Sequence, residues 1–100
     1  MLTKNFKDQE LENLMKAVLA LDCLDEAYAF FEDLCTINEL QAMKQRLQVA
    51  LLARSGMTYH EIAKETGASS ATISRVRRAM DYGSNGYNIV IDRVFTETHP

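Results

Sequence analysis

A single glycine between two short amphipathic segments constrains the fold of this chain more than any other feature. Residues 58–78 read TYHEIAKETGASSATISRVRR. Thr58 and Glu61 have the spacing of a capping box, which predicts that a helix begins just after Thr58. Gly67 then stands where that helix must end in a left-handed conformation, which glycine adopts without a steric penalty. The sequence therefore predicts a helix-turn-helix over about residues 58–80.

The segments on either side of this glycine carry small and apolar residues where two crossed helices would touch. In the first segment Ile62 and Ala63 face inward, and the small Ala63 lets a second helix cross close by. In the second segment Ser69 is a candidate N-cap, and Ile73 and Val76 return the apolar stripe to the first helix. Hairpins with such a seam also occur in helical proteins that never bind nucleic acid, so the outer face has to indicate the function.

The outer face of the second predicted helix carries hydroxyl groups and arginines. Small side chains at a helix N-terminus can approach bases and phosphates closely, and the exposed amides there favour an anion. In helix-turn-helix proteins this helix enters the major groove of DNA. The pattern favours contact with double-stranded DNA over a solvated basic helix end that only suits the helix dipole. The candidate DNA-binding residues are Ser69, Ser70, Ala71, Thr72, Ser74, Arg75, Arg77 and Arg78.

The charge of the chain is distributed unevenly. The net charge of −3 argues against a nucleic-acid partner. However, residues 1–50 hold five Lys/Arg and nine Asp/Glu, whereas residues 54–79 hold five Lys/Arg and two Glu. Attraction to phosphate depends on the local field of the docking face, since salt screens charges beyond about 8–10 Å. We therefore expect DNA binding through the C-terminal half, with modest non-specific affinity.

The N-terminal half is predicted to be a helical scaffold. From Asp8 onward, apolar residues recur with the spacing of an amphipathic helix of about four turns. Asp22 and Asp25 together suggest a weaker cap for a second amphipathic helix. The apolar residues of these two helices are Leu11, Leu14, Met15, Val18 and Leu19, followed by Leu24, Ala27, Tyr28, Phe31 and Leu34.

A longer helix follows, and its apolar surface is wider than a single face. Thr36 and Glu39 form a second capping box, the helix runs to about Arg54, and Gly56 ends it. Apolar residues surround its last turns nearly completely, so this helix must be buried from more than one direction. We therefore predict a two-fold homodimer, with a monomeric six-helix domain as the alternative.

The C-terminal segment is predicted to be a loop followed by a short helix. Residues 81–86 (DYGSNG) form a loop by their glycines and asparagine. Residues 87–95 fit a short amphipathic helix; their β-branched run could also form a strand, but an isolated strand would have no partner. Residues 96–100 are expected to fray. Helix formers dominate the composition, so residues 1–100 are predicted to form one all-α domain.

Several functional classes lack the residues that they require. No apolar stretch is long enough to span a membrane, and the first ten residues do not resemble a secretion signal, so a cytoplasmic protein is expected. Cys23 and Cys35 lack metal-ligand spacing and are expected to be reduced, structural thiols. Only His60 and His99 could act as bases near neutral pH, and no phosphate loop or nucleophile motif is present. We expect neither an enzyme nor a cofactor or metal.

The run from Thr36 through Arg78, about two fifths of the chain, contains a set of residues that can be compared with a known family. The pattern consists of Thr36-Ile37-Asn38-Glu39, Arg46, Met57-Thr58, Gly67-Ala68 and Ala71-Thr72-Ile73-Ser74-Arg75. This pattern resembles the tryptophan repressor superfamily, and especially its small bacterial group of the YerC/YecD type. The resemblance implies six helices and an intertwined homodimer in which the N-terminal helices of both chains share one core.

The resemblance also implies which residues read DNA. Carried over position by position, the recognition surface would be Ser70, Ala71, Thr72 and Ser74, with His60 on the preceding helix. The repressor has a base-reading arginine at the position of His60. Histidine is shorter and mostly neutral at pH 7, so His60 would contact a different base or a phosphate. Alternatively, His60 is an exposed residue of the capping turn.

An effector pocket is implied by the same resemblance. In the repressor, tryptophan lies between two arginines that match Arg46 and Arg75, and a threonine that matches Thr36 lies near the site. The next position after the second arginine is glycine in the repressor and Val76 in this chain. The extra carbons of valine would occupy the space of the indole ring, which close-packed sites tolerate poorly. We therefore predict that tryptophan does not bind; another effector, or none, stays open, and Arg46 could instead be a salt-bridged helix residue.

The sequence thus predicts a sequence-specific, DNA-binding transcriptional regulator that reads the major groove as a homodimer. The alternative is a dimeric helical adaptor for other proteins, which kept the hairpin and lost operator binding. Salt distinguishes the two classes, because affinity for DNA falls steeply as the salt concentration rises.

Overall fold

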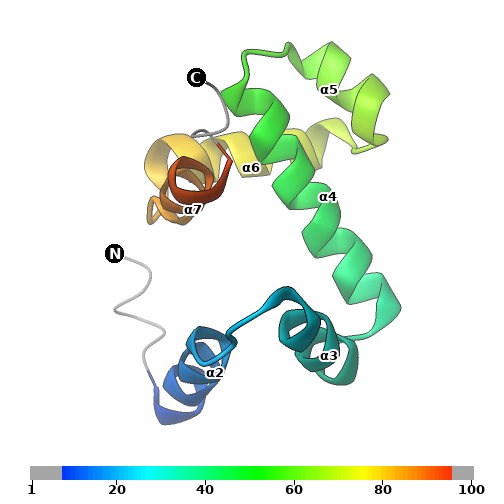
Figure 1. The fold of residues 1–100 in the computed structure, drawn as a ribbon. Helices are drawn as coiled ribbons and strands as arrows, with labels where there is room; N and C mark the ends of the chain where they lie inside the picture. The colour runs from blue at the N-terminus through cyan, green and yellow to red at the C-terminus, as the bar shows by residue number, and fades with distance from the viewer. Residues whose placement is uncertain (1–7, 96–100) are drawn as a thin grey trace. The chain divides into compact units, whose positions relative to one another are not determined.

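The computed structural model describes residues 8–95, which form six α-helices and no strand (Figure 1). The predicted all-α, six-helix fold is confirmed for this part of the chain. The chain divides into two compact units, Met1–Gln41 and Ala42–Pro100, and the boundary lies inside helix α4 (Ile37–Arg54). That residues 1–100 form one domain stays a prediction. The expected frayed tail, residues 96–100 with His99, lies outside the described residues.

The first unit contains two short amphipathic helices, α2 (Gln9–Leu19) and α3 (Leu24–Leu34). Asp8 caps α2, and its Oδ1 atom accepts a hydrogen bond of 2.6 Å from the Leu11 amide. Both helices carry acidic residues in their first turn, where a carboxylate interacts favourably with the helix dipole. The two helices that were expected at the start of the chain are therefore confirmed.

The cap expected from Asp22 and Asp25 at the start of α3 is wrong. The N-cap residue is Cys23, whose side chain makes no capping hydrogen bond. Glu26 reaches back instead, and its Oε1 atom accepts a hydrogen bond of 2.8 Å from the Asp22 amide. Because α3 begins at Leu24, Asp22 lies one position before the N-cap and Asp25 is already in the first turn.

In its described part, the first unit has apolar surface but no buried core of its own. Over its described part, residues 8–41, no residue is buried. The rings of Phe30 and Phe31 lie edge to face with their centres 5.7 Å apart. Several large apolar side chains are exposed: Met15, Leu19, Leu24, Tyr28, Leu34 and Ile37. Two amphipathic helices with this exposure present a surface that a partner could cover.

Helix α4 begins and ends at the residues that the sequence indicates. The Thr36 amide donates to Glu39 Oε1 at 2.8 Å, and the Glu39 amide donates to Thr36 Oγ1 at 3.1 Å, so the predicted capping box is present. At the other end Gly56 adopts φ +95°, and its amide donates to the Ala53 carbonyl at 3.1 Å. The left-handed glycine therefore stops the helix as expected.

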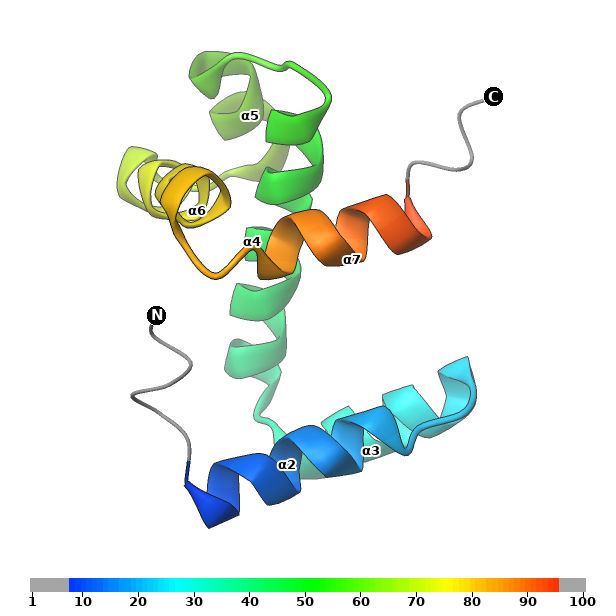
Figure 2. The same ribbon diagram turned by 90° about the vertical axis from the view of Figure 1, so that its left-hand side faces the viewer.

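The second unit contains the hydrophobic core. The later turns of α4 pack with α5 (Tyr59–Thr66), α6 (Ser70–Tyr82) and α7 (Gly86–Val94), and Figure 2 shows α6 and α7 running crosswise beside the end of α4. The helix predicted over residues 87–95 is confirmed, and Ile91 brings α7 into the core. The buried residues are Val49, Ala50, Ala53, Ile62, Ala68, Ile73, Val76, Met80 and Ile91.

Membrane-spanning helices and clusters of metal-ligating side chains are both absent from residues 8–95. None of the helices there is both long and apolar enough to cross a lipid bilayer. In the same range, no group of three or more His, Cys, Asp and Glu side chains is arranged to hold a metal ion. Cys23 is exposed and Cys35 is half-buried, and both are free thiols.

Candidate DNA interface

Helix α5, the first helix of the hairpin, is capped by the predicted box. The Thr58 amide donates to Glu61 Oε1 at 2.9 Å, and the Glu61 amide donates to Thr58 Oγ1 at 3.2 Å. Hydrogen bonding from the Thr58 backbone, and then from its hydroxyl, lowers the pKa of Glu61; the charge of His60 acts weakly in the same direction. His60 itself is exposed in the first turn of α5. The side chain of His60 is therefore accessible to a partner.

The turn between α5 and α6 is held by a glycine and a threonine. Gly67 has φ +73°, and its amide donates to the Ala63 carbonyl at 2.9 Å. The Thr66 hydroxyl donates to the Ile62 carbonyl at 2.7 Å and accepts from the Ala68 amide at 3.1 Å. Ala68 is buried, so this turn is packed against the core and does not form a loose loop. The predicted helix-turn-helix is thus confirmed as a structural motif.

Two residues that hold this turn, Gln45 and Thr66, were not predicted from the sequence. Gln45, on α4, donates from Nε2 to the Thr66 carbonyl at 3.3 Å and so ties the turn to the long helix. Thr66 could have been found from the sequence, because hydroxyl side chains near helix ends often bond the local backbone. Gln45 has no such signal, because it lies 21 residues from its acceptor.

The hydrogen bonds of the first turn divide the small candidate residues at the start of α6 into two groups. Ser69 Oγ accepts from the Thr72 amide at 3.1 Å and donates to Thr72 Oγ1 at 3.1 Å. Thr72 is half-buried, whereas Ser70, Ala71 and Ser74 are exposed. The cap therefore engages the hydroxyls of Ser69 and Thr72. The other three residues form the open part of the predicted recognition surface.

The opposite side of α6 anchors the helix in the core. Ile73, Val76 and Met80 are spaced i, i+3 and i+7, and none of them is more than 9% exposed. In addition, α6 has no acidic residue in its first turn, whereas α2, α3, α4 and α5 all do. The amides at the start of α6 are therefore not neutralised by carboxylates of their own helix, and an anion can approach them.

The arginines of α6 differ in how far the protein neutralises them. Arg77 Nε lies 3.3 Å from Asp81 Oδ2, and both side chains are 43% exposed. Arg75 and Arg78 are exposed, and over the described residues neither forms an ion pair. Of the three predicted arginines, Arg75 and Arg78 therefore present an uncompensated charge to solvent.

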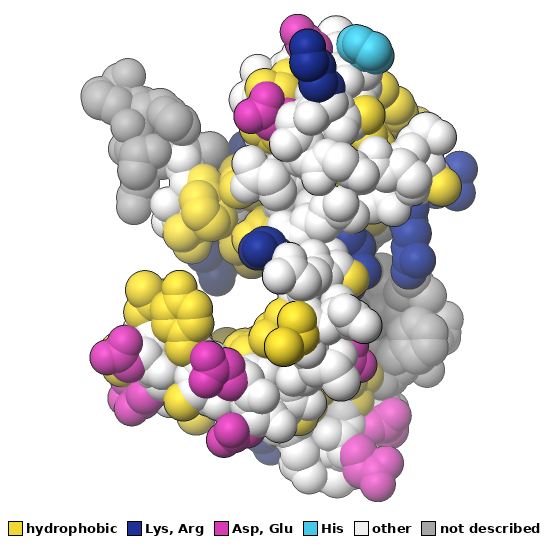
Figure 3. Space-filling view, turned by 90° about the vertical axis from the view of Figure 1, so that its right-hand side faces the viewer, with side chains coloured by type: hydrophobic (Ala, Val, Ile, Leu, Met, Phe, Trp, Pro, Cys, Tyr) yellow, Lys and Arg dark blue, Asp and Glu magenta, His cyan; other side chains and the backbone are white. Residues whose placement is uncertain are grey.

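The basic character of the second unit is weaker than the sequence count suggests. Arg54, one of the five basic residues of region 54–79, pairs with Asp92 on α7. On the face drawn in Figure 3, most Asp and Glu side chains lie on the first unit and most Lys and Arg side chains lie on the second. Attraction to phosphate would then depend on a few unpaired charges, and the expected modest non-specific affinity stays a prediction.

The four residues of the predicted effector pocket have different environments. Thr36 belongs to the first unit, where its hydroxyl and amide form the cap of α4. In the second unit, Arg46 is half-buried and Arg75 is exposed. Within the described part of that unit Arg46 forms no ion pair, so the salt-bridged alternative for this residue is not seen. Val76 is 1% exposed and belongs to the core.

Comparisons with known proteins agree with this geometry. The sequence model of one family, described as Trp repressor protein, matches residues 9–95. An uncharacterized protein of Bacillus subtilis (strain 168), YerC, is 53% identical over 88 residues, which are 88% of this chain and 85% of that protein.

Two solved structures are similar over nearly the whole chain. A TrpR like protein from Eubacterium eligens ATCC 27750 has a TM-score of 0.85 and 52% identity, covering 90% of this chain and 93% of its own. A candidate Trp repressor from Staphylococcus aureus has a TM-score of 0.87 and 45% identity, covering 93% of each chain. At these identities the similarity concerns the family as well as the fold.

Proposed function

The chain belongs to the Trp repressor protein family, and we propose that it is a sequence-specific, DNA-binding transcriptional regulator that acts as a homodimer. The family consists of regulators and not of enzymes. The observation that carries the proposal is the exposed face at the start of α6, which bears small residues and arginines while the opposite face is buried.

The residues of this face have complementary roles in the proposed complex. Ser70, Ala71 and Ser74 let the backbone of α6 lie close to base edges in the major groove. Arg75 and Arg78 neutralise phosphates, which positions the helix without reading sequence. His60, exposed at the start of α5, meets a neighbouring base or phosphate. The cap formed by Ser69 and Thr72 keeps the first turn of α6 in place for these contacts.

The first unit supports the proposed homodimer. Its described residues form two amphipathic helices without one buried residue, yet large apolar side chains such as Leu19 and Leu24 lie on them. Burying one such side chain stabilises a structure by about 1.5–3 kcal/mol, so covering several of them with a second copy is strongly favourable. In helix-turn-helix dimers, the Trp repressor among them, half-sites lie about 34 Å apart, one turn of DNA.

The proposed regulator does not respond to tryptophan. Val76 follows Arg75 on α6, and its side chain is packed in the core of the second unit. A ring placed at this position would have to displace atoms of a close-packed interior. Small-molecule control through a different ligand, or no such control, is compatible with this arrangement.

Selection of bound sequences from a pool of random duplexes tests the proposal. The full chain is incubated with the pool, the retained duplexes are sequenced, and the enriched ones are titrated at several salt concentrations. We expect a motif with two-fold symmetry, with half-sites about 10 base pairs apart, and affinity that falls steeply with salt.

A pair of matched variants connects the result to α6. Ser70→Glu places a negative charge on the exposed face, where it repels phosphate but suits the helix N-terminus, so the fold is retained. Ser84→Glu makes the same change at an exposed loop serine after α6. We expect the first variant to lose enrichment and the second to keep it. A wild-type chain that shifts no duplex even at low salt would exclude DNA binding and favour the adaptor.

A further inference from the structure

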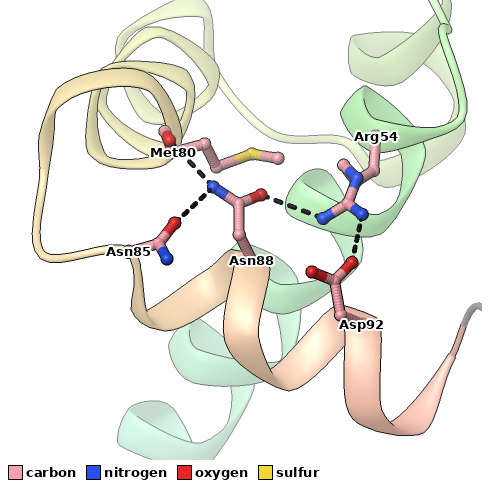
Figure 4. A network of polar contacts seen from close by, with 5 residues as sticks. All are labelled: Arg54, Met80, Asn85, Asn88 and Asp92. Atoms are coloured by element: carbon pink, nitrogen blue, oxygen red, sulfur yellow. Dashed lines mark hydrogen bonds and ion pairs between the residues drawn. The ribbon is translucent and has the colours of Figure 1, made fainter.

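A polar network on the second unit ties the C-terminal end of α6 to α4 and α7 (Figure 4). Asn88 Nδ2 donates to the Met80 carbonyl at 3.0 Å and to Asn85 Oδ1 at 3.1 Å. Arg54 Nη1 donates to Asn88 Oδ1 at 3.0 Å, and Arg54 Nη2 pairs with Asp92. One guanidinium thus holds two side chains that lie one turn apart on α7.

This network supplies a hydrogen bond that the end of α6 needs. The last four carbonyls of a helix have no partner within the helix. In α6 the Ala79 carbonyl accepts from the Gly83 amide at 2.9 Å, and the Met80 carbonyl accepts from Asn88 of the following helix. The chain leaves α6 tightly, since a Cβ atom at Gly83 would lie 2.5 Å from the Ala79 oxygen. The direction in which α7 leaves is therefore restricted by contacts with α6 itself.

The network is better suited to setting a direction than to stabilising the fold. The Arg54 side chain is 34% exposed and that of Asp92 is 60% exposed, so water screens their pairing. In contrast, the planar fork of an arginine fixes the relative orientation of the groups that it binds. Here those groups lie on α7, and Asn88 continues the connection to α6.

We propose that Arg54, Asn88 and Asp92 are positioning residues for DNA recognition, which set the direction of α6 relative to α4. This inference rests on the proposed function. Helix α6 has 13 residues and is about 20 Å long, so a tilt of about 5° around its middle moves its first turn by about 1 Å. A shift of that size misplaces the exposed face against base edges, where hydrogen bonds need distances within a few tenths of an ångström.

Variants of Asp92 distinguish positioning from plain electrostatics. Asp92→Ala removes a negative charge, and if charge alone mattered, binding to any duplex would become tighter. Positioning predicts the opposite for the specific site: affinity about tenfold weaker, the order expected when one base contact is misaligned. Asp92→Asn also removes the charge but keeps an oxygen that accepts from Arg54, so we expect it to restore most of the affinity.

The measurement compares two duplexes: one enriched by the wild-type chain in the selection, and one with the same base composition in scrambled order. We expect Asp92→Ala to lower the affinity for the enriched duplex only. Asn88→Ala should do the same, because the Met80 carbonyl loses its donor. Asp33→Ala, which removes an exposed aspartate on α3, is the control and should leave the ratio of the affinities for the two duplexes unchanged.

Circular dichroism verifies that every variant in the comparison is folded, and light scattering verifies that it has the same assembly state as the wild type. All titrations are made at a temperature at which every variant retains the helical signal of the wild type. Wild-type or tighter binding of the enriched duplex by Asp92→Ala would overturn the positioning role. If the wild-type chain enriches no duplex at all, the proposed function itself fails, and that result is seen before any variant is made.

Discussion

At the residue scale, hydrogen bonds and ion pairs separate the polar side chains that build the hairpin from those left for a partner. Ser69 and Thr72 close the start of α6, and Arg77 shares its charge with Asp81. Arg78, one position further, is exposed and is not paired within the described residues. Neighbouring side chains of the same chemical type therefore have different roles.

Removing Arg78 should affect DNA binding more than removing Arg77. Arg78→Ala should lower the slope of log affinity against log salt by about one, the value for one phosphate contact. Arg77→Ala should lower it by less, because Asp81 already neutralises part of that charge. Fluorescence anisotropy of a labelled duplex at several salt concentrations measures the slope, with Arg93→Ala on α7 as the control. Equal effects of the two variants would contradict this assignment.

Tryptophan should not bind to the chain. Val76 occupies core volume at the position where the repressor has the glycine that leaves room for the indole. Isothermal titration of the full chain with tryptophan is expected to show no heat of binding. A dissociation constant tighter than about 1 mM would mean that Val76 does not close the pocket.

Glu61 should make the stability of the fold depend on pH in the acid range. Hydrogen bonds from Thr58 lower the pKa of Glu61 in the folded state, so its stabilising contribution is present above the ordinary carboxyl value of about 4.3. The contribution is lost as the pH falls through the lower folded pKa. Thermal unfolding of wild type and Glu61→Gln should therefore differ most near neutral pH and converge on acidification. A constant difference would exclude the linkage.

At the element scale, each helix of the hairpin begins at a side-chain cap and turns its apolar stripe inward. Helix α6 is short, with 13 residues, and short helices in water depend on packing and caps for their stability. Its stripe of Ile73, Val76 and Met80 provides the packing, and Ser69 provides the cap. The exposed face of α6 can remain polar because neither the apolar stripe nor the cap requires apolar residues there.

The adjacent residues Ser69 and Ser70 are expected to differ in their contribution to the stability of the fold. Ser69→Ala removes the N-cap and should lower the free energy of unfolding by about 1 kcal/mol. Ser70→Ala changes an exposed residue outside the cap and should leave stability nearly unchanged. Chemical denaturation followed by circular dichroism gives both values. The assignment of the cap would be wrong if Ser70→Ala cost as much as Ser69→Ala.

At the scale of the whole molecule, the two units differ in how they bury apolar surface. All buried residues of the described chain lie in the second unit, whereas the first unit consists of amphipathic helices with exposed leucines. A regulator that reads two half-sites needs two copies of the hairpin, and the apolar surface of the first unit offers the means to hold them together. Acidic residues predominate in the first unit, whereas the first turn of α6 holds no acidic residue and is followed by the exposed Arg75 and Arg78.

Light scattering should give twice the chain mass of 11.3 kDa at micromolar concentration. Leu19 is 83% exposed in the single chain, and Leu19→Glu should shift the protein toward monomer because it places a charge in the proposed shared core. Tyr82→Glu, at a side chain 86% exposed on the second unit, is the matched control and should leave the mass unchanged. A wild-type monomer under these conditions would contradict the dimer.

The sequence by itself determined the helices, the glycine ends and most of the caps, because these depend on residues within one turn of each other. Thr58 with Glu61, Thr36 with Glu39 and Ser69 before α6 all have partners three positions away. The same local signals located the hairpin and therefore the candidate recognition face. The cap of α3 was misplaced because the two candidate residues, Asp22 and Asp25, lie on either side of the true N-cap, Cys23, within two positions of it.

Only the tertiary structure decided which polar groups on the exposed face of α6 stay free of internal hydrogen bonds and ion pairs. It also decided which contacts hold this helix in place. Gln45 bonds the turn from 21 residues away, and Arg54 reaches Asn88 and Asp92 across 34 and 38 residues. Such contacts depend on how packed helices bring distant side chains together, and no periodicity along the chain encodes the pairing. For the same reason the count of basic residues overstated the charge that this face can offer to DNA.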